Sequence, residues 1–397
     1  MNVARLTPAV KTVSLFRLVR HPFRRTRIRF DDSTGKRFPR YAATHLAACV
    51  GVPERFIVAA VDLRRSVLLP LMVTAVLAGP LPAWGLAGTG APTDPNIRYF
   101  GRWTTTSSSA YVSEWAGAYL VAGFTGRSVK LNQRRAIDFF VSIDDGPDVS
   151  YVNRSGTVDL TPAKLAPGRH TLRVSYRPIA GSYKGDAVFQ GITLDPGEST
   201  FAPTVPSKIV EFVGDSITVG QLSSKQALTA YGWLTGEKLK AGHTQIAVGG
   251  ACLHPATDGC LSMREGFLRT GLATTAPAWN FSRYRANAVV INLGTNDVGH
   301  SVTKDQFRDS YVTLLKRARE KYPTAAIFAL GTFRKRFLPE TQAAVKTLTD
   351  GGDRNVYFVS TEGWIDEATD TVDNVHPNDQ GHRKIADRLT PIVAARI

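Results

Sequence analysis

Five short apolar runs, separated by segments of helical period, constrain the fold of residues 208–397 more than any other feature of the sequence. The runs are KIVEFV, HTQIAV, ANAVVINL, AAIFAL and NVYFVS, which begin at residues 208, 243, 286, 325 and 355. Nearly continuous apolar strands that alternate with helices are typical of a parallel sheet with both faces covered. We therefore predict an α/β fold, in which ligands bind at the carboxyl ends of the strands.

The clearest predicted helix runs from Thr303 to Tyr322. Thr303 and Gln306 have the spacing of a capping box, in which each residue satisfies a backbone donor at the start of the helix. An apolar face at helical spacing follows, formed by Phe307, Tyr311, Leu314, Leu315 and Ala318. This segment therefore fits a helix that covers one face of the sheet.

An earlier region has a different pattern. Short β-rich runs, among them AIDFFVSID, HTLRVSYR and AVFQGITL, are separated by turn sequences such as DDGPD, APGRH and DPGES. Strands at this spacing without a helical period predict a β-sandwich. We place this sandwich at residues 97–200, after a Gly/Pro-rich linker at 88–96, and the α/β domain at 206–397.

The N-terminal residues read as a basic extension and a secretion signal. Residues 1–65 hold 14 basic and 4 acidic side chains, a net charge of +10 out of +16 for the chain, so the rest is only mildly basic. No basic face with groove-reading elements is evident, and we expect no nucleic-acid partner. Residues 66–87 contain an apolar core too short to span a bilayer, and Gly85-Leu86-Ala87 offers a cleavage site. Export with cleavage is favoured over a retained membrane anchor.

The chain has three cysteines, Cys49, Cys252 and Cys260, of which two remain after such a cleavage. An even pair in an exported protein favours a local Cys252–Cys260 disulfide. The rival interpretation is a metal site that adds His254 and Asp258, but the ligand spacing is not that of common zinc sites.

A small polar residue follows the first apolar run, where a parallel sheet binds its ligands. Residues 211–220 read EFVGDSITVG, and Ser216 stands three residues beyond the strand. A hydroxyl at the start of the next helix lies near backbone N–H donors and the positive end of the helix dipole. A nucleophile suits this position, but Ser is also a common N-cap, so this stretch alone leaves both interpretations open.

Three further segments carry groups that suit acyl transfer. The amide of Asn296, in NLGTNDVG, and the uncovered N–H groups of Gly249 and Gly250, in IAVGGACL, can donate to an oxyanion. The closing segment VDNVHPNDQGHRKIADRL holds Asp373 and His376, and a carboxylate beside a His fixes the tautomer needed to take a proton from a Ser. Each segment alone fits a plain turn, but their common placement predicts a nucleophilic site.

These blocks resemble, in chain order, the four motifs of the SGNH (GDSL) hydrolases, over residues 208–397. The resemblance implies a flavodoxin-like, three-layer parallel sheet and a serine hydrolase that needs no metal or organic cofactor. It assigns Ser216 as nucleophile, His376 as general base and then acid, and Asp373 as the orienting partner of His376. The implied oxyanion hole consists of the Ser216 N–H, the Gly250 N–H and the Asn296 side chain.

The glycine block departs from the common family pattern. Gln245 and Gly249 stand where many members have an Asn and a small hydroxyl residue. Gly249 is therefore a rival of Gly250 as the backbone donor.

A β-sandwich that begins RYFGRW and precedes an SGNH domain resembles carbohydrate esterase family 2. That family implies an exported enzyme that removes acetyl groups from polysaccharides such as xylan and glucomannan, with a jelly-roll-like first domain. In that family aromatic residues near the site stack on sugar, and Trp364 is the candidate here, although a large aromatic is as often a core residue. We also assign Asp215 as a substrate contact.

We therefore predict a secreted or cell-surface serine esterase that acts on acetylated polysaccharide or another ester. The alternatives are a lipid esterase or thioesterase of the same superfamily, and a carbohydrate-binding module with a vestigial hydrolase domain. The sequence predicts no stable membrane span after cleavage and gives no indication of the oligomeric state.

Overall fold

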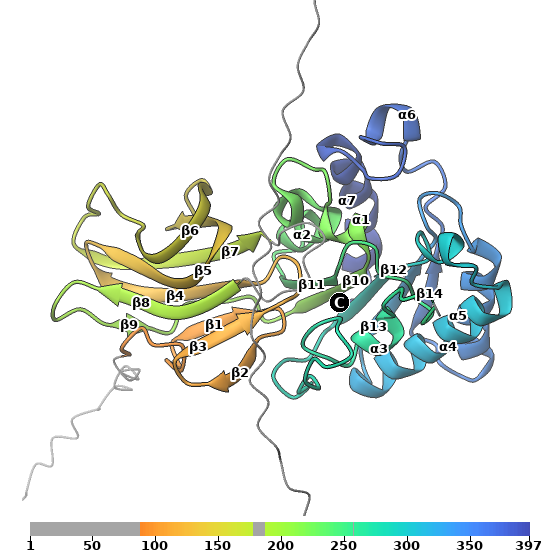
Figure 1. Cartoon of the computed structure of the whole chain (residues 1–397), viewed down its shortest axis with the longest axis horizontal. Helices are drawn as coiled ribbons and strands as arrows, with labels where there is room; N and C mark the ends of the chain where they lie inside the picture. Colours follow the sequence, from red (N-terminus) through yellow and green to blue (C-terminus); the bar gives the residue numbers. More distant parts are fainter. Residues whose placement is uncertain (1–87, 178–186, 257) are drawn as a thin grey trace, which may run out of the picture. The chain divides into compact units, whose positions relative to one another are not determined.

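The computed structural model describes residues 88–177, 187–256 and 258–397, all within one compact unit, residues 78–397. The predicted basic extension, the signal segment and Cys49 lie outside the described residues. The described part contains an antiparallel β domain followed by an α/β domain, as predicted from the two sequence patterns (Figure 1).

The β domain is a curled antiparallel sheet with nine strands within the described residues. The path of hydrogen-bonded neighbours is β1-β4-β7-β5-β8-β3-β2, with β6 paired to β5 and β9 paired to β4. The strands are β1 (Ile97–Phe100), β2 (Thr104–Ser107), β3 (Ala110–Ser113), β4 (Tyr119–Gly126), β5 (Val129–Ile143), β6 (Val149–Asp159), β7 (Gly168–Arg177), β8 (Ala187–Leu194) and β9 (Thr200–Phe201).

Strand β5 folds this sheet back on itself. Its first part, from Val129 to Gln133, pairs with β8, and its second part, from Asp138 to Ile143, pairs with β7. The register shifts near Gln133, and such irregularities bend a strand and increase its twist. The bend lets the two halves of the sheet enclose a buried core, which includes Phe124, Phe139 and Phe189.

The α/β domain is built on a parallel sheet of order β11-β10-β12-β13-β14. The strands are β10 (Ile209–Gly214), β11 (Gly242–Ala247), β12 (Ala288–Asn292), β13 (Ala326–Leu330) and β14 (Val356–Val359). They coincide with the five predicted apolar runs within two residues. The order is that of flavodoxin-like sheets, in which the ligand crevice lies where the strand order reverses. Here that point is the carboxyl edge between β10 and β12.

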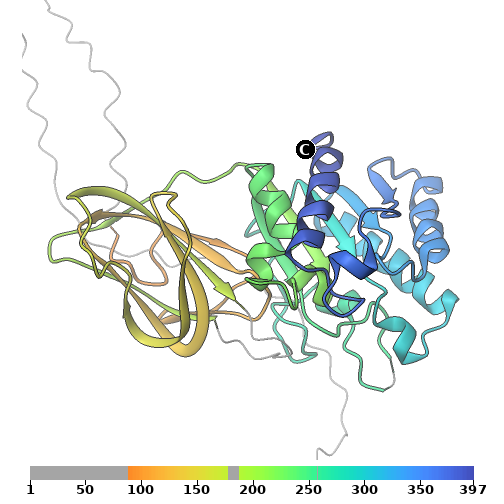
Figure 2. The same cartoon turned by 90° about the horizontal axis from the view of Figure 1, so that it is seen from above.

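Helices cover both faces of this sheet (Figure 2). The helical segments are α1 (Ser216–Val219), η1 (Gln226–Thr229), α2 (Tyr231–Lys238), α3 (Met263–Gly266), η2 (Asp297–His300), α4 (Lys304–Lys321), α5 (Leu338–Asp350), α6 (Glu367–Asp370) and α7 (Asp379–Ala394). Val213 packs in one core cluster with α4 and α5, and its neighbour Phe212 packs in another with α2 and α7. Successive side chains of a strand point to opposite faces, so these helix pairs lie on opposite sides.

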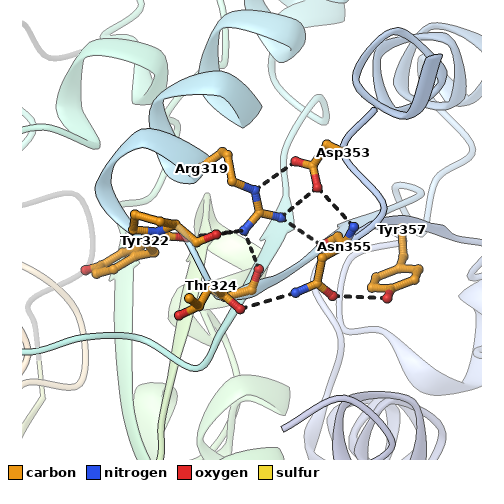
Figure 3. Close-up of polar contacts among 8 residues, drawn as sticks. Arg319, Tyr322, Thr324, Asp353, Asn355 and Tyr357 are labelled. Atoms are coloured by element: carbon orange, nitrogen blue, oxygen red, sulfur yellow. Dashed lines mark hydrogen bonds and ion pairs between the residues drawn. The ribbon is translucent and has the colours of Figure 1, made fainter. Parts of the chain in front are cut away.

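Helix α4 matches its prediction closely. Thr303 is its N-cap, and the reciprocal bonds between Thr303 and Gln306 form the predicted capping box. The predicted apolar face is buried in the core. Near its other end, Arg319 donates two hydrogen bonds to Asp353, at 2.8 and 3.1 Å, and others to the carbonyls of Ala325 and Asn355 (Figure 3). This clamp joins α4 to the segments that lead into β13 and β14.

A buried ion pair joins the two domains. Arg102, just after β1, donates to Glu211 of β10 at 3.0 Å, and neither side chain has exposed surface. Glu211 also accepts hydrogen bonds from the hydroxyls of Tyr284 and Tyr322. Two buried charges remain stable in such a place only when they are paired and hydrogen-bonded.

Within the described ranges, no helix combines the length and apolar character that crossing a bilayer requires.

Candidate active site

Ser216 lies at the carboxyl edge of the parallel sheet, directly after β10, and is the first residue of α1. Only 3% of its surface is exposed. The turn into α1 requires Gly214, because a Cβ there would lie 1.9 Å from the Thr218 hydroxyl and 2.9 Å from the Asn292 carbonyl. The cap of α1 is Asp215, whose side chain accepts from the Ile217 N–H at 3.0 Å. The hydroxyl of Ser216 is therefore not used as the cap.

Three side chains form a continuous polar chain at this edge. The Nε2 atom of His376 lies 2.8 Å from the Ser216 hydroxyl, and its Nδ1 atom lies 2.8 Å from a carboxylate oxygen of Asp373. With the ring proton on Nδ1, the imidazole donates to Asp373 and accepts from Ser216. This is the hydrogen-bond order of a nucleophile, a base and an orienting acid.

The turn that carries Asp373 and His376 is organised locally. The second carboxylate oxygen of Asp373 accepts from the backbone N–H groups of Val375 and His376, at 3.1 and 2.8 Å. Asn374 between them has a φ of 60°, a conformation that Asn tolerates better than most residues. Burial alone would raise the pKa of Asp373, but the hydrogen bonds from His376 and Val375 lower it below its usual value. The carboxylate is thus kept ionised beside the imidazole.

Asn296 lies between β12 and η2, and β12 is the strand next to β10. Its side-chain amide donates to the Ala251 carbonyl at 2.8 Å. A primary amide has two N–H donors, so this bond fixes the orientation of the amide and leaves a second N–H for a ligand.

The glycine block follows β11, on the other side of β10. A Cβ placed on Gly249 would lie 3.9 Å from the Ser216 Cβ, so this backbone passes close to the candidate nucleophile. Gly250 has a φ of 76°, which favours glycine at that position. The block is therefore beside Ser216, and the choice between Gly249 and Gly250 as donor stays open.

The structure argues against the two predicted substrate contacts. Asp215 has no exposed surface, and burial, reinforced by the nearby Asp297 carboxylate, raises its pKa to about 7. Trp364 is 8% exposed and packs in the core with Ile385 and Leu389 of α7. Burial therefore disfavours both contacts: Asp215 caps the helix that begins with Ser216, and Trp364 packs as a core residue, the alternative that the sequence left open.

Asp297 holds the glycine block in place, a role that sequence reasoning missed. Its two carboxylate oxygens accept from the backbone N–H groups of Leu253, at 3.0 and 3.1 Å, and His254, at 2.9 Å. The position of Asp297 within the Gly-x-Asn-Asp motif was visible in the sequence. Its partners are 43 and 44 residues away, so only the fold could identify them.

Cys252 and Cys260 are joined by a disulfide. Among the described residues, one group of three potential metal ligands has its ligand atoms within 4.8 Å of one another. It consists of these two sulfurs and the His300 imidazole. The disulfide occupies both sulfurs, and His300 bonds to Asp258 at 2.6 Å. The arrangement does not suit a metal ion while the disulfide is formed, because metal coordination requires thiolates.

A serine beside a His–Asp pair, at the edge of a flavodoxin-like sheet, has the geometry of a serine hydrolase site. Residues 212–384, which make up most of the α/β domain, match the GDSL-like lipase/acylhydrolase family. Residues 99–203 match the carbohydrate esterase 2 N-terminal domain. This order of two domains is similar to that of the family 2 carbohydrate esterases.

Individual relatives share this architecture. The chain is 30% identical, over 75% of its length, to "Cellulase/esterase CelE" of Acetivibrio thermocellus, and spans 39% of that protein. It is 22% identical, over 76% of its length and 89% of the relative, to an "Acetylxylan esterase / glucomannan deacetylase" of Cellvibrio japonicus. A similar solved structure is a family two carbohydrate esterase from Clostridium thermocellum in complex with cellohexaose, with a TM-score of 0.65 and 26% identity over 75% of this chain and 98% of that one.

Proposed function

We propose that this protein is a serine esterase that removes O-acetyl groups from polysaccharide. The observation that carries the proposal is the chain of hydrogen bonds from Asp373 through His376 to Ser216, with both His376 contacts at 2.8 Å. The substrate class is supported by the names of similar proteins from Cellvibrio japonicus, acetylxylan esterase / glucomannan deacetylase.

In the proposed mechanism, the Ser216 oxygen attacks the ester carbonyl carbon while His376 Nε2 takes the hydroxyl proton. The ionised Asp373 stabilises the resulting imidazolium. When the tetrahedral intermediate collapses, the sugar oxygen leaves with the proton held by His376, and an acetyl group remains on Ser216. Water then attacks this acyl-enzyme with His376 again as base, which releases acetate and restores the serine.

The developing oxyanion would be bound by backbone and side-chain donors at the carboxyl edge of the sheet. Those donors are the N–H of Ser216, an N–H of the Gly249-Gly250 pair, and the second N–H of the Asn296 amide. Donors held in place before the reaction stabilise the transition state without the reorganisation that water would need.

We also propose that the protein acts outside the cell. The basic residues Arg64 and Arg65, the apolar run at residues 67–78 and the small residues at 85–87 support export through a signal peptide. An acetylated polysaccharide is too large to be taken up intact, so an enzyme that acts on it is useful after export.

The test is acetate release by the purified protein from acetylated xylan and acetylated glucomannan, with Ser216→Ala as the matched control. Release that disappears in Ser216→Ala supports a polysaccharide deacetylase. Serine-dependent cleavage of long-chain synthetic esters alone would replace the carbohydrate assignment with a lipid esterase or thioesterase. Binding to the polysaccharide without cleavage of any ester would favour a vestigial hydrolase domain.

A further inference from the structure

The Cys252–Cys260 disulfide lies directly beside the glycine block. Cys252 comes two residues after Gly250, and the Cys260 sulfur lies 3.4 Å from the Gly250 carbonyl oxygen. Both cysteines are buried in the described structure. The backbone that presents the proposed glycine donor is thus in contact with the crosslink.

The residue between Gly250 and Cys252 orients the second proposed donor. The carbonyl of Ala251 accepts the hydrogen bond from the Asn296 amide at 2.8 Å. A shift of the Ala251 backbone would therefore change the direction of the Asn296 amide. One short segment, residues 249–252, controls two of the three proposed oxyanion donors.

This segment lies outside helices and strands, and glycines at 249 and 250 give it more conformational freedom than other residues would. Besides the crosslink, two backbone hydrogen bonds hold its last residue, Cys252. The Cys252 N–H donates to the Leu261 carbonyl at 3.1 Å, and the Met263 N–H donates to the Cys252 carbonyl at 2.7 Å. These bonds form an isolated parallel β-bridge between Cys252 and Ser262, and the disulfide joins the same two segments covalently.

We infer that the Cys252–Cys260 disulfide is a positioning element for the oxyanion hole of the proposed esterase. The inference rests on the proposed function. The crosslink restricts residues 249–252, so that the glycine N–H and the Asn296 amide point at the oxyanion before the reaction begins. An oxyanion exists in the transition state and not in the bound ester, so loss of the crosslink lowers kcat and leaves KM nearly unchanged.

The experiment compares the oxidised protein with the Cys252→Ser/Cys260→Ser double variant and with wild type reduced by an excess of a phosphine. In the reduction, the phosphine gives two electrons to the disulfide, and one water molecule supplies the two protons of the thiols and the oxygen of the phosphine oxide. We expect kcat on an acetyl ester to fall between about tenfold and a hundredfold in both forms, because small displacements of catalytic groups have effects of that size. KM stays within a factor of about two, as expected for a transition-state interaction.

Asp258→Asn is the matched control. Asp258 lies inside the crosslinked loop, where it bonds to His300 and accepts from the Cys260 N–H at 3.3 Å, but it does not touch residues 249–252 in the described contacts. Its substitution loosens the outer part of the loop and leaves the disulfide intact, so kcat stays near that of wild type.

A double-mutant cycle separates positioning from general loss of stability. In the Asn296→Ala background, removal of the cysteines lowers kcat less than in wild type, because one of the positioned donors is already gone. An equal fall in both backgrounds would contradict a role exerted through Asn296. Rates are measured well below the melting temperature of each variant, and circular dichroism confirms that each is folded.

Amide hydrogen exchange supplies a readout that does not require activity. We expect faster exchange at residues 249–254 and 296–300 in the reduced protein, with little change in β10 and β12, because local opening is governed by local contacts. Unchanged kcat or unchanged exchange in the reduced protein would overturn the inference. Absence of any Ser216-dependent cleavage in the oxidised protein, with exchange that still rises on reduction, would instead overturn the proposed function alone.

Discussion

The two loops that meet at Ser216 are held by different means. The turn at residues 371–377, which carries Asp373 and His376, is stabilised by its own backbone: Asp373 binds two nearby N–H groups, and Val372 donates to the His376 carbonyl at 2.9 Å. Asp373 is 42% exposed at its side chain. The loop after β11 is held instead by the disulfide and by Asp297, the first residue of η2.

This difference indicates which of the two loops tolerates amino-acid substitution better. A turn built from adjacent residues re-forms after small disturbances, and water can replace part of the stabilisation of an exposed carboxylate. A loop held by distant residues has no local substitute for its contacts. We therefore expect substitutions that remove the reacting groups to have the largest effect, those in the oxyanion loop the next, and those in the exposed part of the acid–base turn a smaller one.

Replacement of the base has the largest expected effect. His376→Ala removes the only group in contact with the Ser216 hydroxyl among the described hydrogen bonds. We expect kcat on an acetyl ester to fall by about 10⁴-fold or more, as for other serine hydrolases of this type. Steady-state kinetics provide the measurement, and His170→Ala in the β domain is a histidine control that keeps its activity. A His376→Ala enzyme with near-wild-type turnover would rule out the assigned base.

Removal of the side-chain oxyanion donor comes next. Asn296→Ala deletes the second amide N–H and also the bond to Ala251. We expect kcat to fall by roughly a hundredfold to a thousandfold while KM changes little. A larger change in KM than in kcat would show that Asn296 binds the ground state, which contradicts its proposed role.

Asp373→Asn sharpens the comparison between the loops. The amide can still accept the Val375 and His376 backbone bonds, but it no longer stabilises an imidazolium. Because this side chain is partly exposed, we expect kcat to fall by about tenfold to a hundredfold, less than the 10⁴-fold effect known for a buried triad acid. Kinetics at several pH values measure the effect. A loss as large as that of His376→Ala would show that solvent does not compensate.

A buried histidine in α7, the helix after the turn that carries Asp373 and His376, should make the stability of the protein depend on pH. Burial lowers the pKa of His382 in α7 to about 3; the nearby Asp379 opposes the shift and His376 adds to it. The unfolded chain binds this proton near pH 6.5, so the free energy of unfolding falls as the pH falls from 6.5 towards 3, by at most about 1.4 kcal/mol per unit from this group. Denaturant unfolding at pH 7 and pH 5 tests this, with His382→Gln as the variant that loses this part of the slope. Equal slopes in both proteins would contradict the prediction.

The features that sequence predicted well are those encoded by neighbouring residues. The five strands follow from apolar runs, the capping box of α4 follows from Thr303 and Gln306, and the spacing of Asp373 and His376 already fits one turn. Contacts between segments that are distant in the sequence could not be predicted from it. The domain-joining pair of Arg102 and Glu211 is separated by 109 residues.

The two substrate contacts that burial disfavours, Asp215 and Trp364, could not be judged from the sequence. Whether a side chain faces solvent or the core depends on α7 for Trp364 and on the turn into α1 for Asp215, and neither is visible in the local sequence.

The most direct test of the central claim is detection of the acyl-enzyme. The protein is mixed with an excess of an activated acetyl ester, quenched in acid within the first turnovers, digested and examined by peptide mass spectrometry. The account predicts one acetyl group on Ser216, absent from Ser216→Ala and lost on incubation in water when His376 is intact. Steady turnover with Ser216 unmodified, or an acetyl group that accumulates on another residue, would contradict it.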